Sequence, residues 1–312
     1  MGLAIFSGSG NHSLSERVAA ELGVRLGRRD VDRFPDGELH VEMHDSVRGC
    51  DVYLLQSTSP PVDEHLMELL FMADACRRAG AARLTAVIPY YGYARQDRRA
   101  SGREPVGARL TADLLRAGGL NRVIALDLHS TALEGLFTIP LEHLTAVPQL
   151  VEAVEPHLPG NSVVVAPDLG AAKLAERFSK RLQLPVAIIH KLRVSGSDVS
   201  AHTITGDVRD LAPVIVDDMV TTAGTMTAAA QALVEHGAVP EITIVASHAL
   251  LVGPAAERLQ SAPVRRFVTT DSTGVDLTSS LPTQVVSLAP ILAEAIQRLH
   301  SDKSMSDLLV HR

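Results

Sequence analysis

Short runs of Val, Leu, Ile and Ala alternate with segments of helical periodicity along nearly all of the 312 residues. Most of these runs are continuously apolar, as in parallel strands that are covered on both faces. The alternation predicts an α/β fold with doubly wound, mainly parallel sheets, in which ligands bind beyond the carboxyl ends of the strands. The predicted strands are Leu3–Phe6, Leu39–Met43, Val52–Gln56, Leu84–Ile88, Val123–Leu126, Val163–Ala166, Val186–Ile189, Val214–Val216, Ile242–Ala246 and Phe267–Thr270.

The segments between these runs are predicted to be helices. In the first of them, Ser13 and Glu16 match a capping box, which predicts where that helix begins. Pro140–Pro159 carries four prolines and few strand signals, so we place a boundary there, between domains 1–145 and 146–312. We expect the last helix to pack back on the N-terminal domain. The predicted helices are Ser13–Leu22, His65–Arg78, Val106–Ala117, Ala171–Leu182, Thr225–His236 and Pro290–Leu299.

The composition indicates a globular protein with an aliphatic core, because 46% of the residues are hydrophobic, 21% are charged and only 3% are aromatic. A net charge of −7 disfavours a nucleic-acid binder. Cys50 and Cys76 show neither a metal-ligand spacing nor a disulfide framework, which fits a reducing cytoplasm. No apolar run approaches the roughly 20 residues that cross a bilayer. We therefore expect a cytoplasmic protein without a membrane partner.

The stretch Val214–Thr225 joins a β-branched run, two adjacent carboxylates and a loop of small and hydroxyl residues that leads into a helical segment. Such a loop offers backbone N–H groups and hydroxyls that suit a phosphate dianion. Asp217 and Asp218, just before the loop, suit sugar hydroxyls or a cation attached to them. The stretch therefore predicts a sugar-phosphate site. The alternative is an ordinary strand–loop–helix corner with surface acids.

Two polar segments suit a nucleotide. Tyr90–Arg99 gathers three of the four tyrosines and three arginines, whose forks suit phosphate oxygens, while Gln96 can contact a base or sugar. The alternative there is a solvated basic loop, but the aromatic concentration favours a ligand site. Arg33–Glu38 carries the ring of Phe34 and two carboxylates, which suit a purine. Taken alone, this second segment is more typical of a plain Pro-Asp-Gly turn.

Further charged side chains follow predicted strands. Asp127–His129 and Asp168 lie at strand ends, and both residue types contribute naturally to a Mg²⁺–polyphosphate site, although a lone His is more often structural. The histidine spacing does not match a zinc site. His190–Arg193 leaves a strand for a polar loop, where Lys191 and Arg193 suit a transferring phosphoryl group. A surface loop with incidental cations is equally compatible with these residues.

In this order and spacing, these segments resemble the ribose-phosphate diphosphokinase (phosphoribosyl diphosphate synthetase) family, from about Phe6 to the C-terminal helix. The most specific matches are Arg33–Glu38, Ser46–Gly49, Tyr90–Arg99 and Asp217–Thr225. The resemblance implies two phosphoribosyltransferase-type domains. It implies transfer of diphosphate from MgATP to the 1-hydroxyl of ribose 5-phosphate, giving AMP and 5-phosphoribosyl 1-diphosphate for nucleotide biosynthesis. It also implies Mg²⁺ as cofactor and self-association, with a hexamer built from dimers as the expected form.

The resemblance further implies a role for each matched residue. Lys191 and Arg193 would be mobile-loop cations that act on the transition state. His129 and Asp168 would serve the magnesium sites, and adenine would be held across a subunit boundary. The implied ATP-binding residues are Phe34, Asp36, Gly37, Glu38, Arg95, Gln96, Asp97 and His129. The implied ribose 5-phosphate-binding residues are Arg193, Asp217, Asp218, Thr221, Thr222, Ala223, Gly224 and Thr225.

The chain departs from the family pattern in places. Ala223 stands in the phosphate loop where Gly is usual, so its Cβ adds strain if the position requires a positive φ. The mobile loop is less basic than is common. Ser46 and Arg48 fit the family's regulatory site for phosphate and ADP, whereas Gly80 replaces a common regulatory Ser.

Two alternatives compete with this interpretation. A phosphoribosyltransferase that consumes the activated sugar would explain Asp217–Thr225, but it would leave Arg33–Glu38 and Tyr90–Arg99 without a task. A non-catalytic regulatory homologue would usually have lost residues of the mobile loop or the metal site. Lys191 and His129 are both retained here, which disfavours that alternative.

Overall fold

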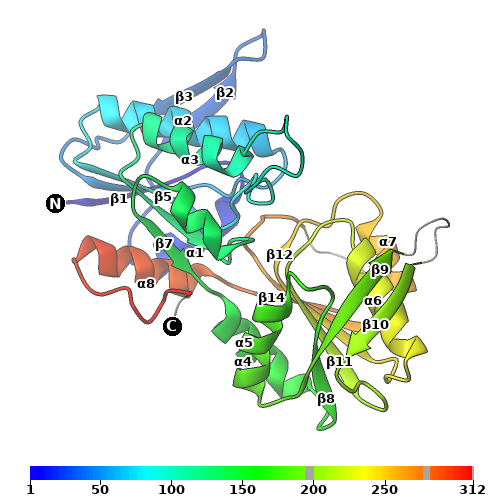
Figure 1. Ribbon diagram of the computed structural model, residues 1–312. Coiled ribbons are helices and arrows are strands. Elements are labelled where there is room, and N and C mark those ends of the chain that lie inside the picture. The colour runs from blue at the N-terminus through cyan, green and yellow to red at the C-terminus, as the bar shows by residue number, and fades with distance from the viewer. Residues whose placement is uncertain (194–199, 277–281, 311–312) are drawn as a thin grey trace. The chain divides into compact units, whose positions relative to one another are not determined.

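The computed structural model describes residues 1–193, 200–276 and 282–310 and divides the chain into two compact units (Figure 1). Unit 1 comprises Met1–Thr145, Ser272–Gly274 and Ser287–Arg312. Unit 2 comprises Ala146–Asp271 and Val275–Val286. None of the helices in the described ranges combines the length and the apolar composition that a membrane span requires.

Unit 1 is built on a five-stranded parallel sheet of order β1-β4-β5-β6-β7. Every residue of the inner strand β4 is buried, as expected for a parallel strand with both faces covered. A separate antiparallel hairpin pairs β2 with β3, and its tip projects beyond the unit's helices in Figure 1. The strands are β1 (Leu3–Ser7), β2 (Arg29–Arg33), β3 (Leu39–Met43), β4 (Asp51–Leu55), β5 (Arg83–Ile88), β6 (Arg122–Leu126) and β7 (Leu141–Leu144). The helices are α1 (His12–Glu21), α2 (Val62–Arg78), α3 (Gly107–Ala117), the 3₁₀ helix η1 (Thr131–Leu136) and α8 (Ala289–His300).

Unit 2 is built on a seven-stranded sheet of order β10-β9-β8-β11-β12-β13-β14, in which only the β9–β10 pair is antiparallel. Its inner strands are runs of small and β-branched residues, and all eight residues of β12 are buried. The strands are β8 (Ser162–Ala166), β9 (Val186–Arg193), β10 (Ser200–Thr205), β11 (Ala212–Val220), β12 (Ile242–Ala249), β13 (Val264–Thr270) and β14 (Thr283–Val286). The helices are α4 (Val147–Val154), η2 (Glu155–His157, 3₁₀), α5 (Ala172–Leu182), α6 (Gly224–Glu235) and α7 (Ala255–Ser261).

All ten predicted strands are present, and four further strands, β2, β7, β10 and β14, were not predicted. Of these, β7, β10 and β14 are edge strands and β2 belongs to the separate hairpin. An edge strand tolerates polar residues, and these four strands lack the long apolar run on which the prediction relied. Pro140–Pro159, which shows few strand signals in the sequence, contains the strand β7 and the helix α4. Pro148 falls in the first turn of α4, where a missing N–H costs little.

The start of α1 corrects the capping-box prediction. The helix is capped by Asn11, whose Oδ1 accepts a hydrogen bond from the backbone N–H of Leu14 at 3.2 Å. Ser13 already lies in the first turn, and its Oγ accepts from Arg17 Nη1 at 2.8 Å. The prediction was wrong because Asn competes well with Ser for the cap position and stands closer to the glycine turn that precedes the helix.

The C-terminal helix α8 is held within unit 1 by a buried carboxylate. Asp51 is 0% exposed, accepts a hydrogen bond from Arg83 Nε at 2.7 Å, and lies 2.8 Å from Nδ1 of His300. Arg83 Nη2 also donates to the carbonyl of Leu299 at 3.0 Å. Burial acts to raise the pKa of Asp51, but the hydrogen bonds from Arg83 and His300 hold it below its ordinary value. The carboxylate therefore stays ionised, and the helix stays anchored.

Candidate active site

Three carboxylates of unit 2 lie at the carboxyl edge of β8 and β11, which are neighbouring parallel strands. Because β11 continues past its predicted end, Asp217 and Asp218 lie within the strand and not after it. Asp168 follows β8, and its Oδ1 accepts hydrogen bonds from the backbone N–H groups of Gly170 at 2.8 Å and Ala171 at 3.2 Å. The structure thus brings these three predicted site residues to one edge of one sheet.

The setting of Asp217 is strongly acidic. Burial, reinforced by the charge of Asp218 and then that of Asp168, raises the pKa of Asp217 well above its usual range. One of its oxygens accepts a hydrogen bond from the backbone N–H of Asp218 at 2.9 Å. A raised pKa means that the protein alone stabilises the ionised form poorly. A ligand that donates hydrogen bonds, such as a sugar hydroxyl, or that brings a cation would relieve this cost.

The predicted phosphate loop follows β11, and α6 begins at Gly224. Its residue Ala223 is buried and has a left-handed backbone, with φ 60° and ψ 3°. The position therefore does require a positive φ. The Cβ of Ala223 adds backbone strain, as the sequence analysis predicted for that case. Such a conformation costs a non-glycine residue about 1–2 kcal/mol.

Two carbonyl groups of the phosphate loop are held from the side of α7. The backbone N–H of Val252 donates to the carbonyl of Thr221 at 3.0 Å. Nη1 of Arg258, on α7, donates to the carbonyl of Thr222 at 3.0 Å. Sequence reasoning missed Arg258, because it lies 36 residues from its partner and belongs to no motif.

The two expected catalytic cations lie on a strand. The backbone of β9 runs through Arg193 and pairs with β10, with Lys191 opposite His202 and Arg193 opposite Ser200. The prediction that the chain leaves its strand at His190 is therefore wrong, because β10 supplies a hydrogen-bonding partner along this whole segment. The side chains of Lys191 and Arg193 lie outside what the structure describes, as does the segment 194–199.

In unit 1, the segment Tyr90–Arg99, which is predicted to contact ATP, follows β5. Some of its side chains are buried in the core and others are exposed. Tyr90 and Tyr91 are buried, and the hydroxyl of Tyr91 donates to the carbonyl of Ala108 at 3.2 Å. These rings pack in the core and so do not support the argument for a ligand site from aromatic concentration. Arg95 and Gln96, by contrast, are exposed. The structure leaves these polar side chains accessible to a ligand at the carboxyl edge of the sheet.

The neighbouring strand β6 ends at the predicted Asp127–His129 segment. Asp127 is buried with a φ of 39°, and His129 is exposed. The segment is fixed by His143 of β7, whose Nε2 accepts a hydrogen bond from the backbone N–H of Leu128 at 2.9 Å. Nδ1 of His143 lies 2.7 Å from Oε1 of Glu134, so this nitrogen carries the proton. Sequence reasoning also missed His143, which lies in an edge strand that was not predicted.

The segment Arg33–Glu38, which is predicted to hold adenine, forms the turn of the β2–β3 hairpin. Phe34 is 49% exposed, and its ring centroid lies 5.1 Å from that of His40. Gly37 has a φ of 93°, and Oδ1 of Asp36 accepts a hydrogen bond from the backbone N–H of Glu38 at 3.1 Å. The hairpin therefore presents a ring and two carboxylates on a sheet separate from the one that carries Arg95.

Among the side chains that the structure describes, the charged groups do not form a dedicated metal centre. Within residues 1–193, 200–276 and 282–310, no group of three or more His, Cys, Asp or Glu side chains is arranged to hold a metal ion. This excludes a zinc-type cage for that part of the chain. It is compatible with Mg²⁺, which usually takes one or two protein ligands together with water and substrate phosphates.

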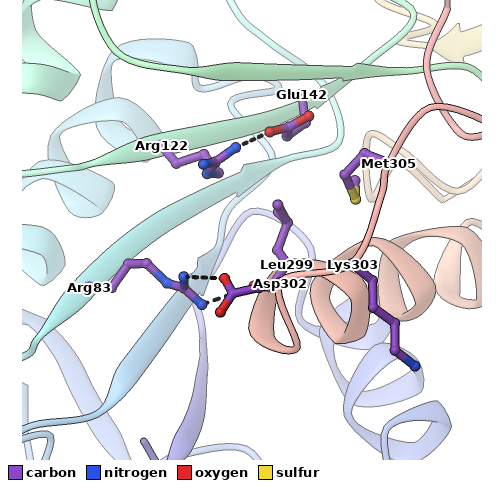
Figure 2. A pocket seen from close by; sticks show the side chains of 7 residues that line it. All are labelled: Arg83, Arg122, Glu142, Leu299, Asp302, Lys303 and Met305. Atoms are coloured by element: carbon purple, nitrogen blue, oxygen red, sulfur yellow. Dashed lines mark hydrogen bonds and ion pairs between the residues drawn. The ribbon is translucent and has the colours of Figure 1, made fainter.

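A pocket of about 350 Å³ lies at the opposite, amino edge of the sheet in unit 1 (Figure 2). Arg83 begins β5 and Arg122 begins β6, and both line this pocket. Arg122 pairs with Glu142, and Arg83 Nη1 lies 3.6 Å from Asp302, so the charges of the pocket are largely balanced. Sheets of this class bind their ligands at the carboxyl edge. We therefore assign no substrate to this pocket.

The chain is similar to known proteins over almost its whole length. Residues 3–119 match the N-terminal domain of ribose phosphate pyrophosphokinase, and residues 193–310 match the phosphoribosyl synthetase-associated domain. Ribose-phosphate pyrophosphokinases of Clostridium tetani and Bacillus subtilis are each 44% identical over 98% of this chain, covering 97% and 96% of those proteins. The crystal structure of phosphoribosylpyrophosphate synthetase from Mycobacterium smegmatis superimposes with a TM-score of 0.92 at 37% identity, covering 97% of this chain and 100% of that one.

Proposed function

The chain belongs to the ribose-phosphate pyrophosphokinase family, and on this premise we propose how its residues divide the reaction between them. Its activity is that of a ribose-phosphate diphosphokinase, with the phosphoribosyltransferase-type fold. It transfers diphosphate from ATP to the 1-hydroxyl of ribose 5-phosphate, and the product serves nucleotide biosynthesis. The observation that carries this conclusion is the 44% identity over 98% of the chain, which spans both units.

We propose that ribose 5-phosphate binds at the carboxyl edge of β11. Thr221–Thr225 would hold the 5-phosphate through the backbone N–H groups at the start of α6 and through threonine hydroxyls. Asp217 and Asp218 would accept hydrogen bonds from the ribose hydroxyls. The raised pKa of Asp217 supports this role, since a donor from the sugar stabilises the carboxylate that burial destabilises.

ATP would bind to residues of unit 1. The exposed Arg95 and Gln96, with Asp97 and His129, would contact the phosphates and ribose of ATP. The β2–β3 hairpin would hold adenine for a neighbouring subunit, with Phe34 stacking on the base and Asp36–Glu38 accepting from its amino group. The exposure of Phe34 and the separate position of the hairpin in the topology support this division.

We propose Mg²⁺ as the cofactor, with His129 of unit 1 and Asp168 of unit 2 each serving a magnesium site. The donor set fits, because an imidazole and a carboxylate placed after strands suit an ion that takes most of its ligands from phosphate and water. When bound, Mg²⁺ acts as a Lewis acid on phosphate oxygens. The protein's own task is to orient the ribose hydroxyl in line with the β-phosphorus, and no covalent nucleophile is required. Lys191 and Arg193 would neutralise charge that grows in the transition state, and Arg193 would also contact ribose 5-phosphate.

We further propose that copies of the chain associate, with a hexamer built from dimers as the expected form, and that they work in the cytoplasm. Met67 and Phe71 of α2 and Leu110 and Leu114 of α3 are between 38% and 58% exposed. The end of α3 lies near α2, because a Cβ placed on Gly118 would be 3.0 Å from Leu70 Cδ2. Exposed apolar side chains on such helices are typical of interaction surfaces.

The function is tested by initial-rate release of AMP from purified protein. We expect AMP only when ATP, Mg²⁺ and ribose 5-phosphate are all present. Product formed only from a nucleobase and 5-phosphoribosyl 1-diphosphate would contradict the proposal and favour a phosphoribosyltransferase. Light-scattering mass measured on the same preparation tests the association.

A further inference from the structure

Arg258 contacts the backbone of the proposed phosphate loop from a different element. Its Nη1 donates to the carbonyl of Thr222 at 3.0 Å, and a Cβ placed on Gly224 would lie 3.6 Å from the same nitrogen. The guanidinium therefore lies beside the first residue of α6. Both α7 and the loop belong to unit 2.

This contact fixes the direction of a neighbouring N–H group. In a trans peptide, the C=O of one residue and the N–H of the next point in opposite directions. When the carbonyl of Thr222 points toward Arg258, the N–H of Ala223 points away from Arg258. In the same way, the Val252 hydrogen bond to the carbonyl of Thr221 turns the N–H of Thr222 outward. Two successive donors thus point away from Arg258 and Val252 and are left for a ligand of the loop.

The loop requires such support for two reasons. Ala223 has a φ of 60°, a conformation that a non-glycine residue leaves readily unless its surroundings fix it. The local charge is also unfavourable for an anion, because Asp217 and Asp218 precede the loop and no Lys or Arg occurs between them and Met226. A guanidinium bound to a loop carbonyl offsets this charge and polarises the attached N–H as a donor.

We propose that Arg258 is a positioning residue for the 5-phosphate of ribose 5-phosphate, acting through the Thr222 carbonyl on the N–H of Ala223. The inference rests on the proposed function, in which this loop holds the phosphate. It assigns to α7 a part in phosphate recognition that the sequence motifs do not indicate. Arg258 serves substrate binding rather than the chemical step. Its loss therefore weakens binding of the phosphate equally in the ground state and in the transition state.

The test compares Arg258→Met with Arg265→Met in steady-state kinetics. Arg265 is a matched control, because it is an exposed arginine paired with Glu241 at the amino end of β13, the edge of the sheet opposite the loop. We expect Arg258→Met to raise KM for ribose 5-phosphate about tenfold, with kcat changed less than about threefold and KM for ATP unchanged. Arg258→Lys keeps a cation and a donor, so its KM should lie between those of the parent protein and Arg258→Met.

A second comparison separates this inference from the proposed function. Thr225→Val removes a hydroxyl of the loop itself. If Thr225→Val raises KM for ribose 5-phosphate while Arg258→Met matches Arg265→Met, the role of Arg258 is wrong and the site stands. If neither variant changes that KM, the loop is not the phosphate site. If Arg258→Met lowers kcat and raises KM for ribose 5-phosphate and KM for ATP by similar factors, Arg258 has a general structural role and the inference is overturned. If Arg258→Met does not fold, Arg258→Lys decides, and a KM equal to that of the control contradicts the proposal.

Discussion

Ala223 shows how a single side chain sets a cost at a ligand site. It is buried, left-handed and placed directly before α6, at the point where the loop turns into the helix. Glycine is the natural residue for such a conformation, because it has no Cβ to clash with the following carbonyl. The sequence could predict this strain only as a condition, since a residue's φ follows from the path of the chain around it.

Replacing Ala223 with Gly should therefore stabilise the protein. We expect the free energy of unfolding in urea to rise by about 0.5–1 kcal/mol, the relief of strain less the greater entropy of glycine in the unfolded chain. Ala228→Gly, inside α6, is the matched control and should lower stability by about 1 kcal/mol. If Ala223→Gly loses as much stability as the control, Ala223 does not strain the backbone.

Asp217 should carry a cost in stability that varies with pH. Its pKa is raised in the folded protein, so between its unfolded and folded pKa values the folded state binds more protons than the unfolded state. The stability contributed by this group is thus fully present at low pH and is lost as pH rises through that window. Asp217→Asn should be more stable than the parent protein at pH 7, and this advantage should vanish near pH 4. KM for ribose 5-phosphate should rise at least about tenfold.

The control for this prediction is Glu235→Gln, which changes an exposed carboxylate at the end of α6. Urea unfolding at several pH values gives the comparison. A stability difference for Asp217→Asn that is independent of pH would show that the carboxylate is not destabilised by its surroundings.

At the level of elements, strands with an apolar run or a clear alternation were predictable, and strands rich in polar residues were not. Strands such as β8 and β12 are buried along their whole length, and each contains a run of apolar residues that the sequence shows. By contrast, β10 reads Ser-Ala-His-Thr-Ile-Thr and β2 reads Arg-Asp-Val-Asp-Arg, which carry little apolar signal. Each is instead stabilised by pairing with the strand next to it in sequence, β10 with β9 and β2 with β3. The candidate acids were therefore found, whereas the hairpins on which Lys191 and Phe34 lie were not.

The β9 strand provides a test of the proposed cations. Lys191→Ala should lower kcat about a hundredfold while changing KM far less, because a cation that meets growing charge acts in the transition state. Lys180→Ala, on α5 and paired with Glu176 at 2.7 Å, is the control and should leave kcat unchanged. Equal turnover in the two variants would remove Lys191 from the mechanism.

The β2–β3 hairpin provides a test of the adenine proposal. Phe34→Ala should raise KM for ATP roughly three- to tenfold, the value of one aromatic stacking contact, without changing KM for ribose 5-phosphate. Val285→Ala, which shortens another exposed apolar side chain, is the control. If KM for ATP is the same in both variants, the ring does not contact the base.

At the scale of the whole molecule, side-chain contacts across long stretches of sequence decide how the chain is divided. Ser57 Oγ donates to the carbonyl of Ser272 at 2.7 Å, and Ser59 Oγ donates to that of Thr273 at 2.7 Å. These bonds hold Ser272–Gly274 within unit 1, more than 200 residues away in sequence. No periodicity or motif marks such contacts, so a sequence shows the alternation of strands and helices but not this return of the chain.

The most direct test of the central claim is a crystal structure of the protein with ribose 5-phosphate and a non-hydrolysable ATP analogue. We predict that the 5-phosphate binds at the N–H groups of Thr221–Thr225, with the ribose hydroxyls on Asp217 and Asp218 and the 1-hydroxyl facing the β-phosphorus. A sugar phosphate bound away from this loop would contradict the account, whatever the rate at which AMP is released.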